Sequence, residues 1–184
     1  DEYPDLKELC FKGPFETLSL TQNTQPFMVL VATIITDLLK ENGIIPAYCA
    51  GLSLGEYSAL YCAGVFEQKQ VIELSRFRGK VMNEAVQGID SAMIAVIKME
   101  RVILEDLCKQ ASSLGIVSIS NYNCPGQLVV SGERKAVEKV KELALEKGAK
   151  RVIALNTSGP FHTALLKEAS LSLKERFQQE TFHE

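Results

Sequence analysis

The pattern Gly51-Leu52-Ser53-Leu54-Gly55 has the residue types and spacing that best fit catalysis in this sequence. It follows a short apolar run, residues 44–50, and precedes a small-residue segment, 57–64, that favours a helix. A G-x-S-x-G sequence between a strand and a helix is typical of a nucleophile elbow, a turn so sharp that its flanking residues must be small. Ser53 is then the predicted nucleophile, and the Leu54 amide would stabilise an oxyanion at the start of the helix. The alternative is a glycine-flanked turn with no chemistry.

A serine nucleophile needs a general base, and the chain has two histidines. His183 lies in a polar tail and is expected to be solvated. His162 follows a predicted strand and the turn Ser158-Gly159-Pro160, at the start of a predicted helix whose dipole disfavours a protonated ring. We therefore predict that His162 is the base, against the alternative of a capping or core histidine. Its ring could be oriented by an acidic residue or by a backbone carbonyl.

Arg78 lies on the apolar stripe of a helix predicted over residues 68–86, in line with Leu74 and Val81. A buried arginine must be paired, because an uncompensated buried charge is strongly destabilising. Its partner is either an internal carboxylate such as Glu56 or the carboxylate of a bound ligand. The spacing alone leaves both open.

Other polar residues carry weaker signals. Gln25, in Thr24-Gln25-Pro26, fits a helix start but could line a cleft. Asn121, Asn123 and Gln127 flank Pro125-Gly126, where a polar turn between two strands is favoured over a binding role. The sequence has no P-loop, no dinucleotide fingerprint and no metal-ligand cluster, so we expect no bound cofactor and no metal.

Two regions of the chain, each with its own pattern of helices and strands, are expected to position these candidate site residues. The first has a helix starting at Thr24, with Phe27, Leu30, Ile34 and Leu38 on one face, and then a buried parallel strand over 44–50. The second has strands and helices in the order β-α-β-β-α-β, typical of a ferredoxin-like unit. These elements are expected over residues 92–97, 100–112, 116–120, 127–131, 133–147 and 151–155.

We therefore predict an α/β protein. Residues 1–87 and 155–184 would form an α/β-hydrolase-like body with a parallel sheet and a nucleophile elbow, incomplete at both ends. Residues 88–154 would form an inserted ferredoxin-like α+β subdomain.

Composition excludes several classes of protein. The 184 residues carry a net charge of −3 and are 46% apolar, which fits a globular protein and argues against a nucleic-acid binder. No apolar run is long enough to span a membrane. The five cysteines are odd in number and form no C-x-x-C pair, a pattern typical of reduced thiols in the cytoplasm. A monomer is the default expectation.

Taken together, these residues resemble the malonyl-CoA:acyl-carrier-protein transacylases and the acyltransferase domains of fatty-acid and polyketide synthases. The resemblance rests on five blocks in family order: Thr24-Gln25-Pro26, Gly51–Leu60, Arg78–Ala85, Asn121–Gln127 and Pro160-Phe161-His162.

The resemblance implies a role for each matched position. Ser53 would be acylated by a malonyl group, and His162 would activate first Ser53 and later the incoming thiol. Arg78 would bind the free malonyl carboxylate, and Leu54 would supply one oxyanion amide. Phe161 is similar to the malonyl-selecting form of the family.

The sequence departs from the family at Leu52, where a histidine is usual. The family's glycine- and glutamine-rich opening strand, which completes the oxyanion hole, has no counterpart in these residues, nor has the C-terminal part that helps orient the histidine. The expected body is therefore an incomplete acyltransferase.

The implied activity is transfer of a malonyl group from coenzyme A to the phosphopantetheine thiol of acyl carrier protein, through a Ser53 acyl-enzyme, in fatty-acid biosynthesis. The substrate would be malonyl-CoA and the protein partner acyl carrier protein. One alternative is a serine hydrolase or thioesterase that uses the same elbow. Another is a truncated, non-catalytic domain that binds carrier protein.

Overall fold

The computed structural model describes residues 4–183 and divides the chain into two compact units. The first unit contains the residues up to Met82 and those from Ser172 onward, and the second contains Asn83–Leu171. Two helices pass from one unit to the other, α5 (Gln68–Ala85) and α8 (Lys167–Phe177).

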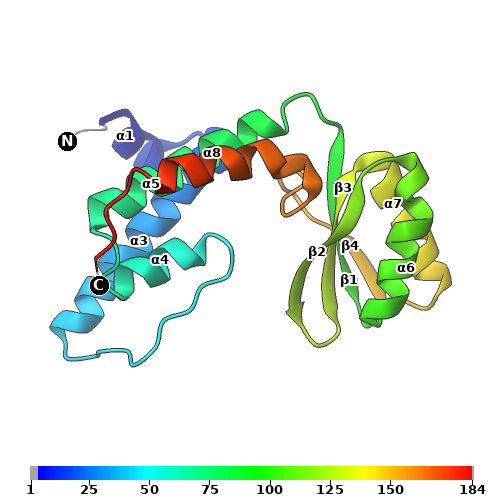
Figure 1. Cartoon of the computed structure of the whole chain (residues 1–184), viewed down its shortest axis with the longest axis horizontal. Coiled ribbons are helices and arrows are strands. Elements are labelled where there is room, and N and C mark those ends of the chain that lie inside the picture. The colour runs from blue at the N-terminus through cyan, green and yellow to red at the C-terminus, as the bar shows by residue number, and fades with distance from the viewer. Residues whose placement is uncertain (1–3, 184) are drawn as a thin grey trace. The chain divides into compact units, whose positions relative to one another are not determined.

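All the regular secondary structure in the described part of the first unit is helical. Its other helices are α1 (Pro4–Lys12), α2 (Phe15–Leu18), α3 (Thr21–Glu41) and α4 (Gly55–Cys62). Helices α3, α4 and α5 pack around a small core of Val29, Tyr57, Phe66, Val71 and Leu74. This core joins α3, α4 and α5, the three helices that carry or flank the predicted site residues of the first unit (Figure 1).

Helix α3 starts earlier than predicted and buries a different face. It begins at Thr21 rather than near Thr24, so Pro26 lies inside the helix. Its buried residues are Thr21, Gln25, Pro26, Val29 and Thr33. The predicted apolar face is half-buried or exposed at Phe27, Leu30, Ile34 and Leu38. Within its described residues the first unit contains no sheet that could bury the predicted face.

The strand predicted over residues 44–50 is not found. These residues form an exposed loop between α3 and α4, drawn in cyan in Figure 1. A strand is stable only when neighbouring strands satisfy its backbone hydrogen bonds. The part of the chain that the structure describes contains no parallel strand pair, so the predicted parallel sheet is not observed there.

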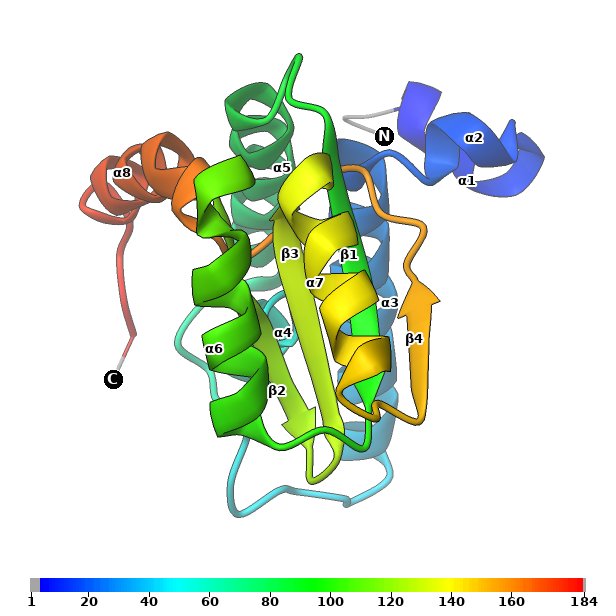
Figure 2. The same ribbon diagram turned by 90° about the vertical axis from the view of Figure 1, so that its right-hand side faces the viewer.

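The second unit is a four-stranded antiparallel sheet with two helices on one face. Its strands lie in the order β2-β3-β1-β4, and Figure 2 shows α6 and α7 side by side in front of them. The sequence of elements agrees with the predicted β-α-β-β-α-β order. The bounds are β1 (Ser91–Ile97), α6 (Arg101–Ala111), β2 (Val117–Cys124), β3 (Gln127–Glu133), α7 (Arg134–Glu146) and β4 (Arg151–Ala154). Short 3-10 helices follow α6 (η1, Ser112–Leu114) and precede α8 (η2, Ala164–Leu166).

Successive side chains of β1 point to opposite faces of the sheet, and the two faces contact different residues. Ile94 and Val96 belong to the core shared with α6 and α7. Met93 and Ala95 point to the opposite face, where they form a second cluster with Val129.

Strand β2 is longer than predicted. Asn121 and Asn123, expected in a polar turn, lie inside β2, with irregular pairing to β3 around both positions. The turn itself is shorter, at Pro125-Gly126, where Gly126 adopts a φ of 83°. The tight hairpin lets the ladder extend through residues that their polarity alone assigns to a loop.

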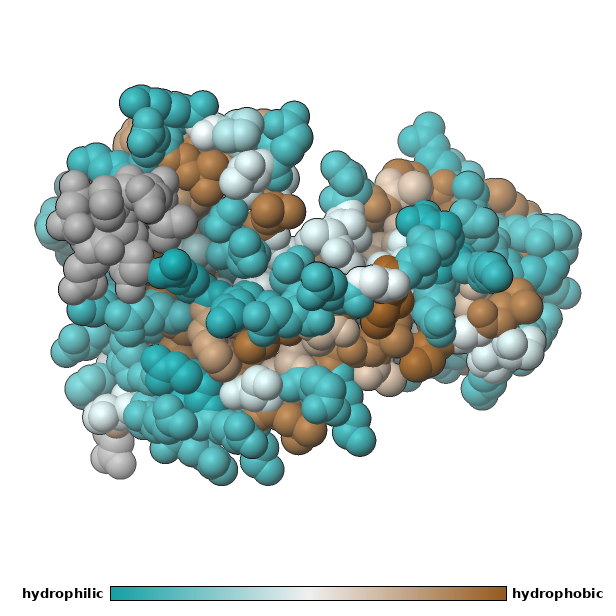
Figure 3. Space-filling view, turned by 90° about the horizontal axis from the view of Figure 1, so that it is seen from above, coloured by the Kyte–Doolittle hydropathy of each residue, from teal (hydrophilic) through white to brown (hydrophobic). Residues whose placement is uncertain are grey.

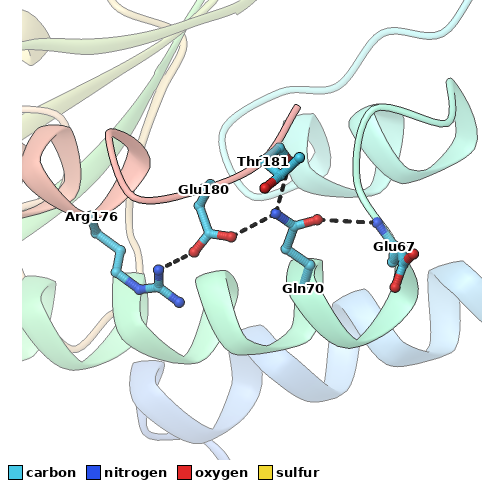
Figure 4. Close-up of polar contacts among 5 residues, drawn as sticks. All are labelled: Glu67, Gln70, Arg176, Glu180 and Thr181. Carbon is cyan, nitrogen blue, oxygen red and sulfur yellow. Dashed lines mark hydrogen bonds and ion pairs between the residues drawn. The ribbon is translucent and has the colours of Figure 1, made fainter. Parts of the chain in front are cut away.

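The C-terminal residues of the first unit are anchored by polar contacts (Figure 4). Glu180 forms an ion pair with Arg176 and accepts a hydrogen bond from Gln70 Nε2 at 2.6 Å. The same nitrogen donates to the Thr181 carbonyl at 3.0 Å, and Gln70 Oε1 accepts from the Glu67 amide.

Aromatic rings support the same segment. The ring of Phe177 is centred 6.1 Å from that of Tyr57, and Phe66 lies 4.9 Å from Phe182. Phe177 and Phe182 are therefore packed against α4 and the segment that leads into α5.

On the face drawn in Figure 3, patches of hydrophobic residues lie between larger hydrophilic areas. Within residues 4–183, no helix is long and apolar enough to cross a membrane. The described residues also contain no group of three or more histidine, cysteine or acidic side chains that could hold a metal ion.

Candidate active site

Ser53 lies on a sharp turn directly before helix α4. Its φ of 53° is left-handed, a conformation that is strained for a residue with a side chain. A Cβ added to Gly51 would lie 2.0 Å from the Gly55 carbonyl carbon, so only glycine fits at Gly51. At Gly55 the corresponding space is open, and the steric requirement falls on one flank of the turn rather than on both.

Arg78 reaches this turn from α5. Its Nη2 donates a hydrogen bond to Ser53 Oγ at 3.0 Å, and its Nη1 donates to Gln25 Oε1 at 2.8 Å. Arg78 is only 8% exposed, as its place on the apolar stripe predicts. Three residues far apart in the sequence are thus brought together around one guanidinium.

The Arg78 guanidinium also lies over an aromatic ring. Its central carbon is 5.8 Å from the ring centroid of Tyr57, within the range of a cation–π contact. Burial raises the pKa of Tyr57 to about 12, so the ring is a neutral phenol at physiological pH. Tyr57 is not among the predicted site residues, although its place one helical turn after Ser53 could have indicated it.

No carboxylate pairs with Arg78 among the described residues. Its hydrogen-bond partners are a neutral amide and a hydroxyl, and Glu56 acts on it only through its charge. Desolvation lowers the pKa of Arg78, and Tyr57 and Glu56 counteract that effect. The internal ion pair that we considered for Arg78 is therefore absent, and the buried cation can still attract an anion.

Gln25 and Leu54 complete the predicted residues of the first unit. Gln25 is buried, and its Nε2 lies 3.6 Å from Met82 Sδ while its oxygen accepts from Arg78. This contact holds the amide with its oxygen towards the guanidinium. Leu54 directly precedes α4, so its amide lies at the positive end of the helix dipole.

His162, Phe161 and Asn121 lie in the second unit. His162 follows β4, and its φ of 59° is left-handed, as is that of Ser53. Phe161 packs against the sheet cluster of Met93, Ala95 and Val129, so this segment lies on the face opposite α6 and α7. Asn121 is a half-buried residue of β2 whose Oδ1 accepts a hydrogen bond from Ser120 Oγ at 2.9 Å.

The family model for the acyl transferase domain matches residues 5–181. The chain belongs to the acyl transferase domain family. Its curated relatives in this family include the malonyl CoA-acyl carrier protein transacylase of Bacillus subtilis (strain 168), which is 45% identical over 171 residues. That match covers 92% of this chain and 54% of the relative. The Escherichia coli (strain K12) transacylase is 38% identical over 180 residues, covering 97% of this chain and 58% of the relative.

Solved structures of acyl transferases agree with this assignment. The crystal structure of MCAT from Streptococcus pneumoniae is 42% identical with a TM-score of 0.91, covering 98% of this chain and 59% of that one. A malonyl-transacylase solved in complex with a type II PKS acyl-carrier protein is 41% identical with a TM-score of 0.92, covering 97% and 58%. The chain thus spans somewhat more than half the length of these relatives.

Proposed function

We propose that this chain is the part of a malonyl-CoA:acyl-carrier-protein transacylase that carries its nucleophile, its base and its carboxylate-binding arginine. The observation that carries the proposal is the Arg78–Ser53 hydrogen bond at 3.0 Å, made by a buried guanidinium that pairs with no described carboxylate. A malonyl group has a thioester carbonyl at one end and a free carboxylate at the other. Arg78 would bind the carboxylate while Ser53 attacks the carbonyl.

The proposed reaction has two acyl transfers. His162 removes the proton from Ser53 Oγ, which attacks the thioester of malonyl-CoA, and the Leu54 amide stabilises the oxyanion. Coenzyme A leaves with the proton from His162. The phosphopantetheine thiol of acyl carrier protein then attacks the Ser53 ester, and His162 acts as base again.

The other matched residues have supporting roles in this proposal. Gln25 orients Arg78, as its 2.8 Å hydrogen bond allows. Phe161 favours a malonyl group, as the family resemblance implies, and Asn121 is a further substrate-binding residue. We also propose the α/β-hydrolase-like body, over residues 1–87 and 155–184, and the ferredoxin-like subdomain, over 88–154, as the organisation of this enzyme. We still predict that the protein is cytoplasmic and monomeric.

Intact-mass measurement tests the proposed acyl-enzyme. The full-length protein is exposed briefly to malonyl-CoA, with the Ser53→Ala variant as control. We expect a malonyl adduct on the wild type, none on the variant, and discharge of the adduct when carrier-protein thiol is added. Absence of any adduct would support a non-catalytic, carrier-protein-binding domain instead.

The same measurement separates transfer from hydrolysis. A hydrolase or thioesterase would lose its acyl group to water before a thiol is added. A malonyl adduct that persists in water and leaves only with thiol supports the transacylase.

A further inference from the structure

Met82 is a buried residue of α5, one helical turn after Arg78, and its sulfur contacts the side chain of Gln25. Met82 is 5% exposed, and its Sδ accepts a hydrogen bond from Gln25 Nε2 at 3.6 Å. The same amide accepts a hydrogen bond from Arg78 Nη1 at 2.8 Å through its Oε1. Gln25 is also buried, so both contacts are made away from solvent. The amide therefore bridges two residues that lie four apart on one face of α5.

The two ends of the Gln25 amide have opposite hydrogen-bonding character, although they are almost the same in shape. With the oxygen towards Arg78, the cation has an acceptor and the NH₂ group has the thioether sulfur, which is a weak acceptor. If the amide turned over, the NH₂ group would face a guanidinium that can only donate, and the oxygen would face a sulfur that carries no proton. Both buried contacts would be lost, which is costly for polar atoms away from water. Met82 thus favours one of the two orientations.

A close approach of α3 to α5 keeps Gln25 at this position. Gly79 directly follows Arg78 on α5. A Cβ added to Gly79 would lie 2.7 Å from Gln22 Cα and 2.8 Å from the Thr21 carbonyl oxygen. Backbone atoms at the start of α3 therefore contact α5 one helical turn before Gln25, so the two helices are held together where the amide spans them.

We propose that Met82 is a positioning residue for the selection of malonyl groups, and that it acts through Gln25 on Arg78. This inference rests on the proposed function, in which Arg78 binds the free malonyl carboxylate. The sulfur keeps the Gln25 oxygen towards the guanidinium, and that hydrogen bond holds the arginine where its Nη2 reaches Ser53 Oγ at 3.0 Å. An arginine that moved within its site would hold the carboxylate less firmly and place the thioester less accurately for attack.

The test compares the full-length enzyme with its Met82→Leu variant, because leucine fills a methionine site at little cost but has no acceptor atom. We expect kcat/KM for malonyl-CoA to fall by about 3- to 10-fold and that for acetyl-CoA to change by less than about 2-fold, since an acetyl group has no carboxylate for Arg78 to hold. Met99→Leu, the same change at a buried methionine of the second unit, is the matched control and should keep both values. An unchanged malonyl-to-acetyl ratio in Met82→Leu would overturn the proposal.

A double-mutant cycle separates positioning from packing. In a Gln25→Leu background there is no amide to orient, so Met82→Leu should have no further effect on the malonyl-to-acetyl ratio. An equal effect of Met82→Leu in both backgrounds would show that the methionine acts through packing or on the substrate directly, against the proposal.

Hydrogen exchange of the Gln25 side-chain NH₂ protons, followed by NMR, gives a readout that needs no activity. We expect slow exchange in the wild type and faster exchange in Met82→Leu, because the variant removes the acceptor. A wild-type enzyme that transfers no malonyl group would overturn the proposed function, whatever the exchange rates. A wild-type enzyme that transfers malonyl groups, with exchange and selectivity unaltered by Met82→Leu, would overturn this inference alone.

Discussion

Arg78 and Ser53 are joined by a 3.0 Å hydrogen bond from Nη2 to Oγ, although one lies in the middle of a long helix and the other on a sharp turn. The bond places a permanent positive charge beside the proposed nucleophile. In the proposed reaction, a group that binds to Arg78 by its carboxylate would have its other end near Ser53, which would link substrate selection to attack.

Replacing Arg78 by alanine should change acyl selectivity. Without the guanidinium, a bound malonyl carboxylate has no partner, so we expect the malonyl-to-acetyl ratio of kcat/KM in the full-length enzyme to fall by about 100-fold. Arg76→Ala, an exposed position on the same helix, is the matched control and should keep the ratio. An unchanged ratio in Arg78→Ala would show that the arginine is structural.

Tyr57 should position Arg78 through the face of its ring. Tyr57→Phe keeps that face, whereas Tyr57→Leu fills a similar volume without it. We therefore expect the leucine variant to lose about 3- to 30-fold in kcat/KM for malonyl-CoA, corresponding to a cation–π contact of about 0.5–2 kcal/mol, and the phenylalanine variant to stay near wild type. Equal loss in both variants would assign the effect to the hydroxyl instead.

Gly51→Ala should destabilise the turn that carries Ser53. The added methyl group would collide with backbone atoms of Gly55, the nearest at 2.0 Å, and these cannot rotate away. We expect a loss of about 1–3 kcal/mol in the free energy of unfolding, measured by urea denaturation.

Gly55→Ala is the matched control, because open space surrounds its Cβ position and alanine favours the helix that begins there. Equal destabilisation by the two substitutions would contradict the one-sided turn described above.

Glu180→Ala should loosen the C-terminal segment. The Glu180 side chain is 8% exposed, and its removal leaves Arg176 and Gln70 without their shared partner. A loss of about 1–3 kcal/mol in unfolding free energy is expected, with faster hydrogen exchange around residues 177–183. Glu175→Ala, on an exposed face of α8, should have little effect, and an equal effect would argue against the anchor.

Local patterns predicted much of the second unit. Its strands alternate and its helices are amphipathic, and each pattern depends on residues close in sequence. The prediction of a polar turn at Asn121 and Asn123 was wrong, because antiparallel pairing with β3 outweighs their preference for turns. The strand predicted over residues 44–50 was also wrong, because an apolar run forms a strand only where a neighbouring strand can pair with it.

Spacing along the chain is enough to predict that Ser53 lies on a cramped turn after a glycine and that Arg78 lies on a buried helical face. The groups that surround Arg78 depend instead on how the helices pack. Gln25 comes from α3, whereas Ser53 and Tyr57 come from the turn and the start of α4. Spacing along the chain cannot tell an amide or a hydroxyl at hydrogen-bond distance from a carboxylate such as Glu56. The packing of α3 and α4 against α5 determines the surroundings of Arg78. It brings Gln25, Ser53 and Tyr57 to the guanidinium and leaves Glu56 without an ion pair to it.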